Sequence, residues 1–211
     1  MRPWTQAFRL VPLVAAAALA GACSRAPENP ERRPTGPRWG PADRLGVRGR
    51  RMSDPAAPGH RLLSLWRTLQ PLPGGRRVFA TLLARMVPYT GSIGARVLEL
   101  EPGRVTVALA DRRRVRNHLG SVHAVALVNV GELATGLSIL TALPPGIRGI
   151  VTGLSAEYVR KARGPLTAHA DVRALELPRL TGRRDIEAIA EIRDAAGEPV
   201  ARVTARWRLS P

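Results

Sequence analysis

The stretch NHLGSVHAVALVNVGELATGLSILTAL, residues 117–143, constrains the fold more than any other part of the chain. It opens with small and polar residues, as a loop does, and is then apolar on nearly every side until Pro144 and Pro145 end any helix. The pattern predicts one buried helix of about 22 residues, a rod of about 33 Å whose start Ser121 can cap. A helix that is apolar all round must be enclosed by other structure, and we expect that structure to be a sheet.

A lone carboxylate, Glu132, lies within this apolar stretch. Burying it ionised is costly unless it has a partner or a purpose. Asn129 and Thr135 lie three residues to either side, on the same helix face, and could hold the carboxylate or an attacking water. Gly131 and Gly136 each cost the helix about 1 kcal/mol relative to alanine, which the close approach of a ligand or a strand would explain. We therefore centre the functional hypothesis on Glu132; the structural alternative is a carboxylate hydrogen-bonded to a neighbouring strand.

Apolar spacing predicts the remaining elements. Residues 60–86 show helical spacing on both sides of a Pro/Gly break, which predicts two short helices packed on the domain. Their expected apolar faces are Leu62, Leu65, Trp66 and Leu69 in the first, and Val78, Phe79, Leu82, Leu83 and Met86 in the second. Alternation then predicts a hairpin, 97–101 with 104–110, before the long helix, and after it the strands 150–163, 166–175, 186–194 and 200–209.

This order, two strands, one long helix and four strands, indicates an α+β domain. An antiparallel sheet wrapped around a single central helix buries the apolar helix and also satisfies strands that are apolar on one side. The last strand shows this alternation most clearly, with Ala201, Val203, Ala205, Trp207 and Leu209 on the expected inner face. We expect one domain over residues 61–211, with its core at about 90–210.

The first 60 residues read as an extension. Residues 1–23 combine two arginines, a short apolar run and small residues ending in Cys23, the layout of a secretory signal with a weak bacterial lipoprotein box. The apolar run is too short to span a bilayer, and residues 24–60 have the composition of a disordered segment. Met52, however, opens a stretch typical of a protein start. We therefore expect a cytoplasmic protein that starts at Met52; the alternative is an exported lipoprotein anchored through Cys23.

The net charge of +17 comes almost entirely from arginine, because Lys161 is the one lysine. The excess is spread along the chain, so it can attract polyanions without specifying one. The sequence lacks zinc-finger spacing and basic patches interleaved with aromatics, which argues against a nucleic-acid partner. We expect no integral membrane span, no metal site and no cofactor.

The central loop and helix resemble those of hotdog-fold acyl-CoA thioesterases of the phenylacetyl-CoA (PaaI-like) type, and more closely a bacterial branch of that superfamily. The resemblance covers about residues 90–210 and is carried by Asn117, Gly120, His123, Glu132 and the segment 151–168. In the family pattern an Asn and a Gly precede a His-Gly-Gly turn, and a helical Asp or Glu lies nine positions after that His. Here His123 and Glu132 are nine positions apart.

This chain departs from the pattern at Ala124 and Val125, which replace the two glycines. Ala124 keeps a backbone N–H, so a contact with the oxyanion is still expected, whereas Val125 narrows the room for a bulky acyl group. The resemblance implies that Glu132 acts as nucleophile toward a thioester carbonyl or as general base for water, and that the Ala124 N–H polarises the carbonyl oxygen. His123 and Asn117 would orient the thioester or the water. Structural alternatives are that His123 caps the helix and that Asn117 stabilises the turn.

Nine residues amount to two and a half helical turns, so His123 and Glu132 can share a site in two ways. Either His123 lies at the mouth of the helix or the site spans two subunits. Proteins of this type usually pair with sites at the interface, so the resemblance implies a homodimer or tetramer.

The resemblance further implies an acyl-CoA substrate, with coenzyme A as part of the substrate. The expected substrate-binding residues are Gly120, Ser121, Asn129, Thr135, Gly136, Arg160, Lys161 and Arg163. Arg112, Arg113, Arg114 and Arg116 would join the last three at the coenzyme A phosphates, although solvated strand ends would look the same in sequence. Because the glycine pair is missing, a non-catalytic hotdog domain that binds acyl thioesters or serves in assembly is the alternative function.

Overall fold

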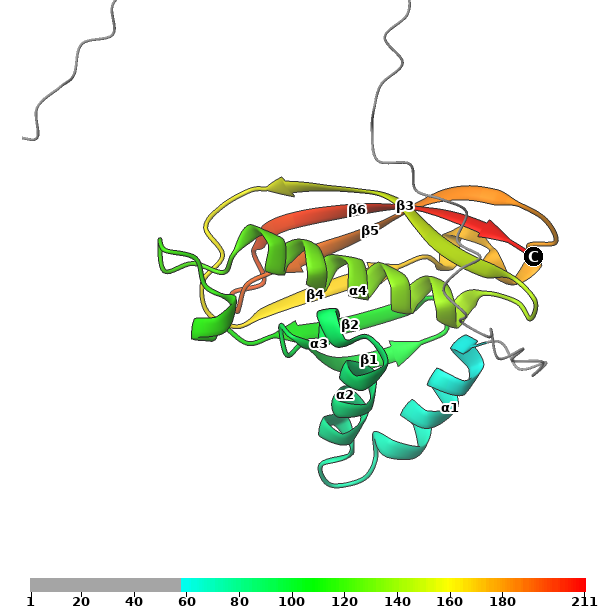
Figure 1. Ribbon diagram of the computed structural model, residues 1–211, viewed down its shortest axis with the longest axis horizontal. Helices are drawn as coiled ribbons and strands as arrows, with labels where there is room; N and C mark the ends of the chain where they lie inside the picture. Colours follow the sequence, from blue (N-terminus) through cyan, green and yellow to red (C-terminus); the bar gives the residue numbers. More distant parts are fainter. Residues whose placement is uncertain (1–57) are drawn as a thin grey trace, which may run out of the picture. The chain divides into compact units, whose positions relative to one another are not determined.

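A computed structural model describes residues 58–211. Three helices come first, followed by a β-hairpin, the long helix and four strands (Figure 1). The helices are α1 (Pro58–Leu69), α2 (Gly75–Met86), α3 (Pro88–Gly91) and α4 (Ala124–Ala142); the strands are β1 (Arg96–Glu101), β2 (Arg104–Leu109), β3 (Arg148–Tyr158), β4 (Leu166–Asp171), β5 (Arg184–Arg193) and β6 (Pro199–Ser210). Short 3₁₀ turns are η2 (Arg113–Val115), η3 (Arg173–Leu175) and η4 (Leu177–Arg179). The signal-like segment, Cys23 and the expected start at Met52 lie outside the described residues.

The six strands form one antiparallel sheet in the order β1-β2-β4-β5-β6-β3. Helix α4 runs across one face of this sheet and packs against all six strands (Figure 1). The expected architecture, an antiparallel sheet wrapped around a single long helix, is therefore confirmed. By length and composition α4 could cross a membrane, yet 72% of its apolar window is buried inside the domain, which makes it the core helix.

Strand β6 shows why the sheet curves around α4. Its small and apolar side chains alternate with arginines, and the predicted inner face is buried: Ala201, Val203, Ala205, Trp207 and Leu209. The arginines between them point to the opposite, hydrated face, where Arg202 and Arg206 are exposed. One-sided strands of this kind need an apolar partner on one face alone, and α4 is that partner.

Helices α1 and α2 form the predicted pair on either side of the Pro/Gly break. The Trp66 and Phe79 rings meet edge to face, with centroids 5.0 Å apart and planes at 72°, a favoured aromatic geometry. The predicted inner face of α2 is partly wrong, because Val78 and Met86 are 49% and 69% exposed. The 12-residue helix α2 packs on the domain through Phe79, so its outer side and its C-terminal end are in solvent.

Three predicted boundaries also need correction. Helix α4 begins at Ala124 and is capped by His123, so Ser121 is not its cap. Strand β3 ends at Tyr158, five residues before its predicted end, since an irregular segment follows. Strand β4 ends at Asp171, after which η3 and η4 turn the chain back toward β5.

The two glycines beside Glu132 have different neighbours, which gives a stability test. A methyl group at Gly131 would lie 2.5 Å from Cβ of the buried Val203, whereas at Gly136 the nearest atom, in the Trp207 ring, is 3.4 Å away. We expect Gly131→Ala to lower the free energy of unfolding by about 1–3 kcal/mol through overpacking. Gly136→Ala should be neutral or stabilise by up to about 1 kcal/mol through helix propensity.

Urea denaturation of both variants measures this difference. Adding Val203→Ala to Gly131→Ala makes room for the new methyl group and should recover part of the loss beyond what additivity predicts. Equal destabilisation by the two single variants would contradict the assignment of Gly131 to a helix–strand contact.

Candidate active site

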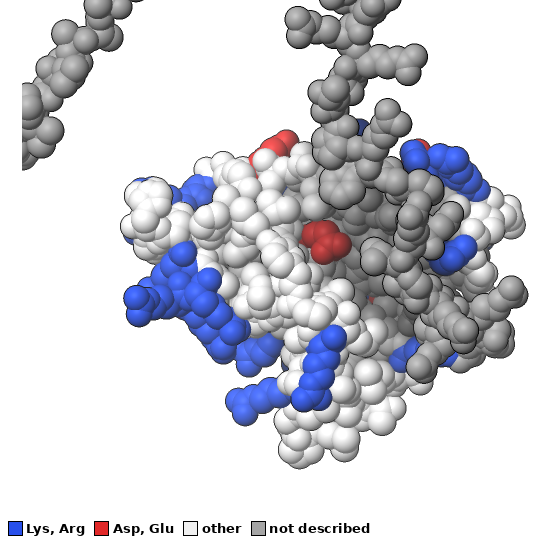
Figure 2. Space-filling view, in the orientation of Figure 1, with Lys and Arg blue, Asp and Glu red and all other residues white. Residues whose placement is uncertain are grey.

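Glu132 lies in the middle of α4, on the strip of that helix that is least covered. Its side chain is half-buried and follows the exposed Val125 and the half-buried Val128 along the same strip. Figure 2 shows acidic atoms over α4, with uncharged surface to their left and below them. Within residues 58–211 no hydrogen bond or ion pair to the Glu132 carboxylate is found, and burial raises its pKa. A carboxyl group of this kind is more basic than an exposed one.

Thr135 and Asn129, the two polar neighbours expected to hold this carboxylate, do not hydrogen-bond to it in the subunit. The Thr135 hydroxyl donates to the backbone carbonyl of Glu132 at 3.0 Å, as helical Thr side chains often do. Asn129 is only 7% exposed, and its Oδ1 is buried with no hydrogen-bond partner. Gly136 lies near the carboxylate, since a methyl group there would be 3.9 Å from Glu132 Oε1.

The loop before α4 is held by Asn117. Its Oδ1 accepts from the backbone N–H groups of Leu119 and Ser121, at 3.0 and 3.2 Å, and from the Ser121 hydroxyl at 3.1 Å. Gly120 has a φ of 67°, a conformation that favours glycine. Asn117, Gly120 and Ser121 therefore build a tight turn, which is the structural role weighed for Asn117 from the sequence.

This turn places His123 at the mouth of α4, meaning its N-terminal end, where His123 is the N-cap. The His123 Nδ1 accepts from the Val125 N–H at 3.1 Å, and the His123 N–H donates to the Val115 carbonyl at 2.7 Å. No hydrogen bond from residues 58–211 involves the Ala124 N–H, which is the first of the helix and lies at an exposed residue. An unpaired N–H at a helix start can stabilise developing negative charge.

Helix geometry separates this N–H from the carboxylate within one subunit. Ala124 and Glu132 are eight residues apart, or about 12 Å along the axis, and His123 is about 13.5 Å away. These distances exceed what one thioester carbonyl can bridge. His123 thus lies at the helix mouth, the first of the two arrangements considered from the sequence, but that position alone does not bring it to Glu132.

Basic side chains gather at the end of the domain where α4 begins (Figure 2). Two segments meet there, because the Val122 N–H donates to the Ala162 carbonyl at 2.9 Å and the Gly164 N–H to the Asp111 carboxylate at 2.9 Å. Arg116 also pairs with Asp111 at 2.6 Å and holds the pKa of that carboxyl below its usual range. Arg160 pairs with Asp194 at 2.9 Å. Five other basic residues of these segments have no ion pair with a residue of 58–211: Arg112, Arg113, Arg114, Lys161 and Arg163.

A small cavity of about 170 Å³ opens beside the mouth of α4. Helix α4 lines it with Val125, Ala126 and Asn129, and the cap residue His123 adds a fourth side chain. The other walls come from the α3 region and from η2: Tyr89, Ser92, Ile93, Arg114, Val115 and Arg116. Sequence reasoning missed the α3 wall, because a four-residue helix after a proline leaves no periodic signal.

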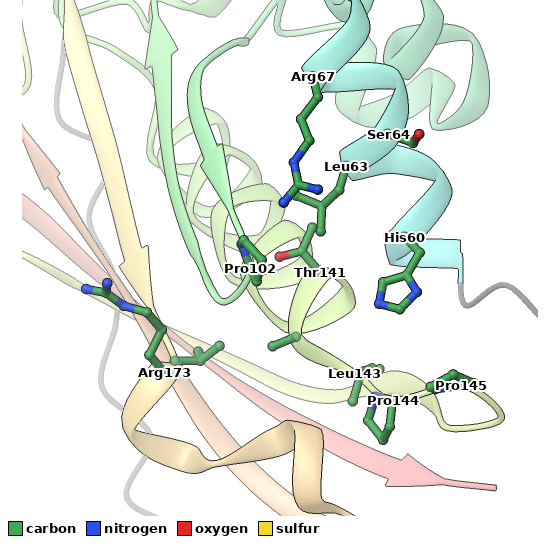
Figure 3. Close-up of a pocket in the computed structure, with 12 residues that line it drawn as sticks. His60, Leu63, Ser64, Arg67, Pro102, Thr141, Leu143, Pro144, Pro145 and Arg173 are labelled. Atoms are coloured by element: carbon green, nitrogen blue, oxygen red, sulfur yellow. The ribbon is translucent and has the colours of Figure 1, made fainter.

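A larger cavity, of about 670 Å³, lies at the opposite end of α4 (Figure 3). It is formed by α1, the β1–β2 turn and the segment after α4, and its polar lining includes His60, Arg67, Thr141 and Arg173. None of the residues expected to form the site lines it. Its size alone does not make it the active site, because the unpaired carboxylate and the unpaired N–H both lie elsewhere.

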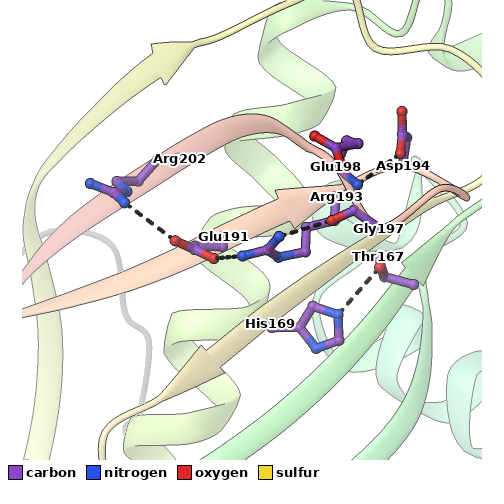
Figure 4. Close-up of polar contacts among 8 residues, drawn as sticks. All are labelled: Thr167, His169, Glu191, Arg193, Asp194, Gly197, Glu198 and Arg202. Atoms are coloured by element: carbon purple, nitrogen blue, oxygen red, sulfur yellow. Dashed lines mark hydrogen bonds and ion pairs between the residues drawn. The ribbon is translucent and has the colours of Figure 1, made fainter.

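The outer face of the sheet carries polar groups that satisfy one another (Figure 4). Glu191 accepts from Arg193 at 2.6 Å and from Arg202 at 3.2 Å, and His169 lies 3.3 Å from the Thr167 hydroxyl. Among residues 58–211, no group of three His, Cys, Asp or Glu side chains could hold a metal ion. The buried side-chain atoms without a hydrogen-bond partner among the described residues, Asn129 Oδ1 and Trp207 Nε1, are both on the α4 side of the sheet.

Comparisons with known proteins agree with this architecture. Residues 75–209 match a family model described as a domain of unknown function (DUF4442). A structural-genomics crystal structure, APC5556, is 31% identical with a TM-score of 0.63, over 71% of this chain and 98% of its own. PA5026 from Pseudomonas aeruginosa, called a probable thioesterase, is 26% identical with a TM-score of 0.58, over 66% and 96%. A thioesterase family protein from Silicibacter pomeroyi shares the fold at 21% identity and a TM-score of 0.52, over 62% and 95%. A comparison with curated proteins finds no match.

Proposed function

The chain belongs to the family of domains of unknown function (DUF4442), a hotdog-like family, and from this premise we propose that it hydrolyses acyl thioesters of coenzyme A or an acyl carrier. Glu132 would act as nucleophile or general base, and the Ala124 N–H would polarise the thioester carbonyl. The 26% identical relative from Pseudomonas aeruginosa, called a probable thioesterase, supports this reaction class.

The unpaired carboxylate of Glu132 carries the proposal. A structural carboxylate in an apolar helix would be expected to have a hydrogen-bond or ion-pair partner, and Glu132 has none among the described residues. Burial keeps its pKa raised, which suits proton abstraction from water or attack on a carbonyl carbon. As a nucleophile, Glu132 would form a mixed anhydride as the C–S bond breaks, and water would then hydrolyse that anhydride. As a general base, it would take a proton from the water that attacks the carbonyl carbon. In either route negative charge develops on the carbonyl oxygen and the thiolate leaves.

The separation of Ala124 and Glu132 makes this a two-subunit proposal. Strand β3, 11 residues long, is an edge strand of the sheet. Its outer edge has no partner strand in the described chain. Leu154, Tyr158 and Val159 on or after this strand are 46%, 51% and 62% exposed. A long, apolar edge strand favours pairing with another chain, so a second copy would bury it.

A two-fold pairing along β3 also fits the site. It would set the two α4 helices antiparallel, and we place the two-fold axis near Val128 because that residue is midway between Ala124 and Glu132 in sequence. Each Glu132 would then face the Ala124 of the partner subunit. Tyr158 already links β3 to the helix start, because its hydroxyl donates to the Ala124 carbonyl at 3.4 Å.

Coenzyme A phosphates would meet the basic side chains at the start of α4. Arg114, Lys161 and Arg163 have no ion pair among the described residues and come from the two segments that flank the loop. Guanidinium groups suit phosphate oxygens because they donate two parallel hydrogen bonds.

A non-hydrolytic acyl-thioester-binding domain is the second candidate. The observation that favours it is Val125, which is 52% exposed at the mouth of α4 in place of the second family glycine. A turnover assay separates the two functions: the dimer should release free thiol from short acyl-CoAs at a rate proportional to enzyme concentration. Binding of acyl-CoA without any thiol release would establish the second function.

A further inference from the structure

The cavity beside the mouth of α4 has a positively charged wall. Its charged side chains are both cationic, Arg114 and Arg116, and no acidic side chain among the described residues lines it. Arg116 is paired with Asp111 at 2.6 Å, whereas Arg114 has neither an ion pair nor a hydrogen bond with a residue of 58–211. Arg114 therefore brings an uncompensated charge and a guanidinium group with only donors to this wall.

Asn129 adds a further donor to the cavity. Its side chain lines the cavity although the residue is only 7% exposed. The amide oxygen, Oδ1, is fully enclosed, whereas the amide nitrogen, Nδ2, keeps accessible surface and has no hydrogen-bond partner within residues 58–211. The polar atom of Asn129 that a ligand can reach is therefore Nδ2, which can only donate.

His123 has the same polarity at the helix mouth. Its Nδ1 accepts from the Val125 N–H at 3.1 Å and so carries no proton, which leaves the proton of the neutral ring on Nε2. His123 also lines the cavity. A lining of cations and N–H donors matches a group that carries negative charge and only accepts, and a carboxylate is such a group.

We propose that this cavity is the acyl-group site of the thioesterase and that it selects short dicarboxylic acyl groups, whose terminal carboxylate binds Arg114 and the Asn129 Nδ2. The inference rests on the proposed function. It adds to that function a substrate class, with succinyl and glutaryl thioesters as its simplest members, and a residue that determines specificity, Arg114. The products of hydrolysis would be the free dicarboxylate and coenzyme A.

The size and position of the cavity agree with this class. A cavity of about 150 Å³ can hold a benzene ring, so the 170 Å³ here has room for the about five non-hydrogen atoms that follow the carbonyl carbon of a succinyl group. The cavity adjoins the N–H proposed to polarise the thioester carbonyl, because His123 and Val125, on either side of Ala124, both line it. Apolar walls such as Ile93 suit the methylene carbons between the two carbonyl groups.

Arg114 is held close to this N–H by its surroundings. The next residue, Val115, accepts from the His123 N–H at 2.7 Å, which ties the turn that carries Arg114 to the helix cap. A methyl group at Gly94 would overlap Arg114 Nη2, so the guanidinium packs against the backbone at this glycine. A cation that is already positioned loses less conformational entropy when it binds a carboxylate.

The phosphates of coenzyme A are the other anions that Arg114 could bind. The pantetheine arm, a chain of amide and methylene groups, separates these phosphates from the thioester sulfur. Of the cations proposed to meet the phosphates, Arg114 lines the cavity, whereas Lys161 and Arg163 do not. The position of Arg114 therefore favours the acyl group, and the phosphates are left to Lys161 and Arg163.

Thioesters of matched shape test the inference in the wild-type protein. Succinyl-CoA is compared with butyryl-CoA, which lacks the carboxylate, and with 4-methylpentanoyl-CoA, in which an isopropyl group replaces it. We expect kcat/KM for succinyl-CoA to exceed both by about 10- to 100-fold, because a charge-assisted hydrogen bond forms with succinyl-CoA alone. Thiol release without protein is subtracted, since the free carboxylate can attack its own thioester. Equal or higher kcat/KM for the uncharged thioesters would overturn the inference while leaving thioester hydrolysis intact.

Arg114→Gln separates a contact with the acyl group from a contact with a phosphate. Each substrate carries the same coenzyme A, so loss of a phosphate contact would lower every kcat/KM by the same factor. Loss of the carboxylate contact should instead lower the ratio of succinyl-CoA to 4-methylpentanoyl-CoA by about 10-fold or more. Arg113→Gln, on the same 3₁₀ turn but outside the cavity, is the matched control and should keep the wild-type ratio. An unchanged ratio in Arg114→Gln would overturn the inference.

Calorimetric binding to Glu132→Gln tests the inference without turnover. If the wild type hydrolyses none of these thioesters but Glu132→Gln binds succinyl-CoA about 10-fold or more tightly than the uncharged pair, the proposed reaction fails and the cavity assignment stands. Binding without that preference, or no binding of any of them, would overturn the inference.

Discussion

Replacing Glu132 with glutamine is expected to lower kcat for acyl-CoA hydrolysis by about 10²- to 10⁴-fold, the usual contribution of a positioned base. Glutamine keeps the size of the side chain and loses its basicity, so KM should change little. Thiol release under saturating substrate measures the loss. Glu187→Gln is the matched control, because that residue is exposed on the outer face of β5 and should retain wild-type kcat.

The same variant should separate activity from stability. Burial raises the folded-state pKa of Glu132, so its contribution to stability is fully present below the unfolded pKa and is lost as pH rises through the folded pKa. Glutamine does not titrate. The unfolding free energy of Glu132→Gln should therefore rise relative to that of the wild type as pH increases above about 4.5. Urea denaturation between pH 4 and 8 checks this trend. If the unfolding free energy of the wild type exceeded that of Glu132→Gln at neutral pH, Glu132 would have a structural partner.

The fold could be predicted from the sequence because its strongest signals are local and periodic. An all-apolar helix bounded by Pro144 and strands such as β6 with strict alternation leave little choice of architecture. The start of α4 was less predictable, because two side chains near it are able to act as the helix N-cap. Ser121 and His123 can both cap a helix, and the Asn117 carboxamide engages Ser121, which leaves His123 as the cap.

The candidate site was predictable in part. Glu132 was singled out as the lone carboxylate of an apolar helix, and His123 by the family resemblance. The structure places Glu132 half-buried with no partner among the described residues, and His123 at the helix mouth. The unmet Asn129 acceptor and the α3 wall of its cavity could not be read from sequence, because they depend on side chains that meet only in the folded domain. The proposed meeting of Ala124 and Glu132 would need a second subunit, so the fold of one chain does not test it.

Ala124→Pro is expected to lower kcat by about 10²- to 10³-fold, the cost of losing one donor to a developing oxyanion. Proline removes the Ala124 N–H, yet it is favoured at the first position of a helix. The preceding residue tolerates it as well, since His123 has φ −66° and ψ 140°, in the region that proline requires. Circular dichroism and the thermal midpoint should therefore match wild type. Full activity in Ala124→Pro would exclude this N–H from catalysis.

Mixing the two inactive variants tests whether the site is shared between subunits. In a mixed dimer, the Ala124→Pro subunit supplies an intact Glu132 and the Glu132→Gln subunit supplies an intact Ala124 N–H. Unfolding and refolding an equal mixture should restore about a quarter of wild-type activity, because half of the dimers are mixed and each contains one intact site. Each variant refolded alone is the control. A mixture no more active than its parents would place both groups in a single subunit or remove one of them from the reaction, and the pairing of α4 helices about Val128 would then be wrong.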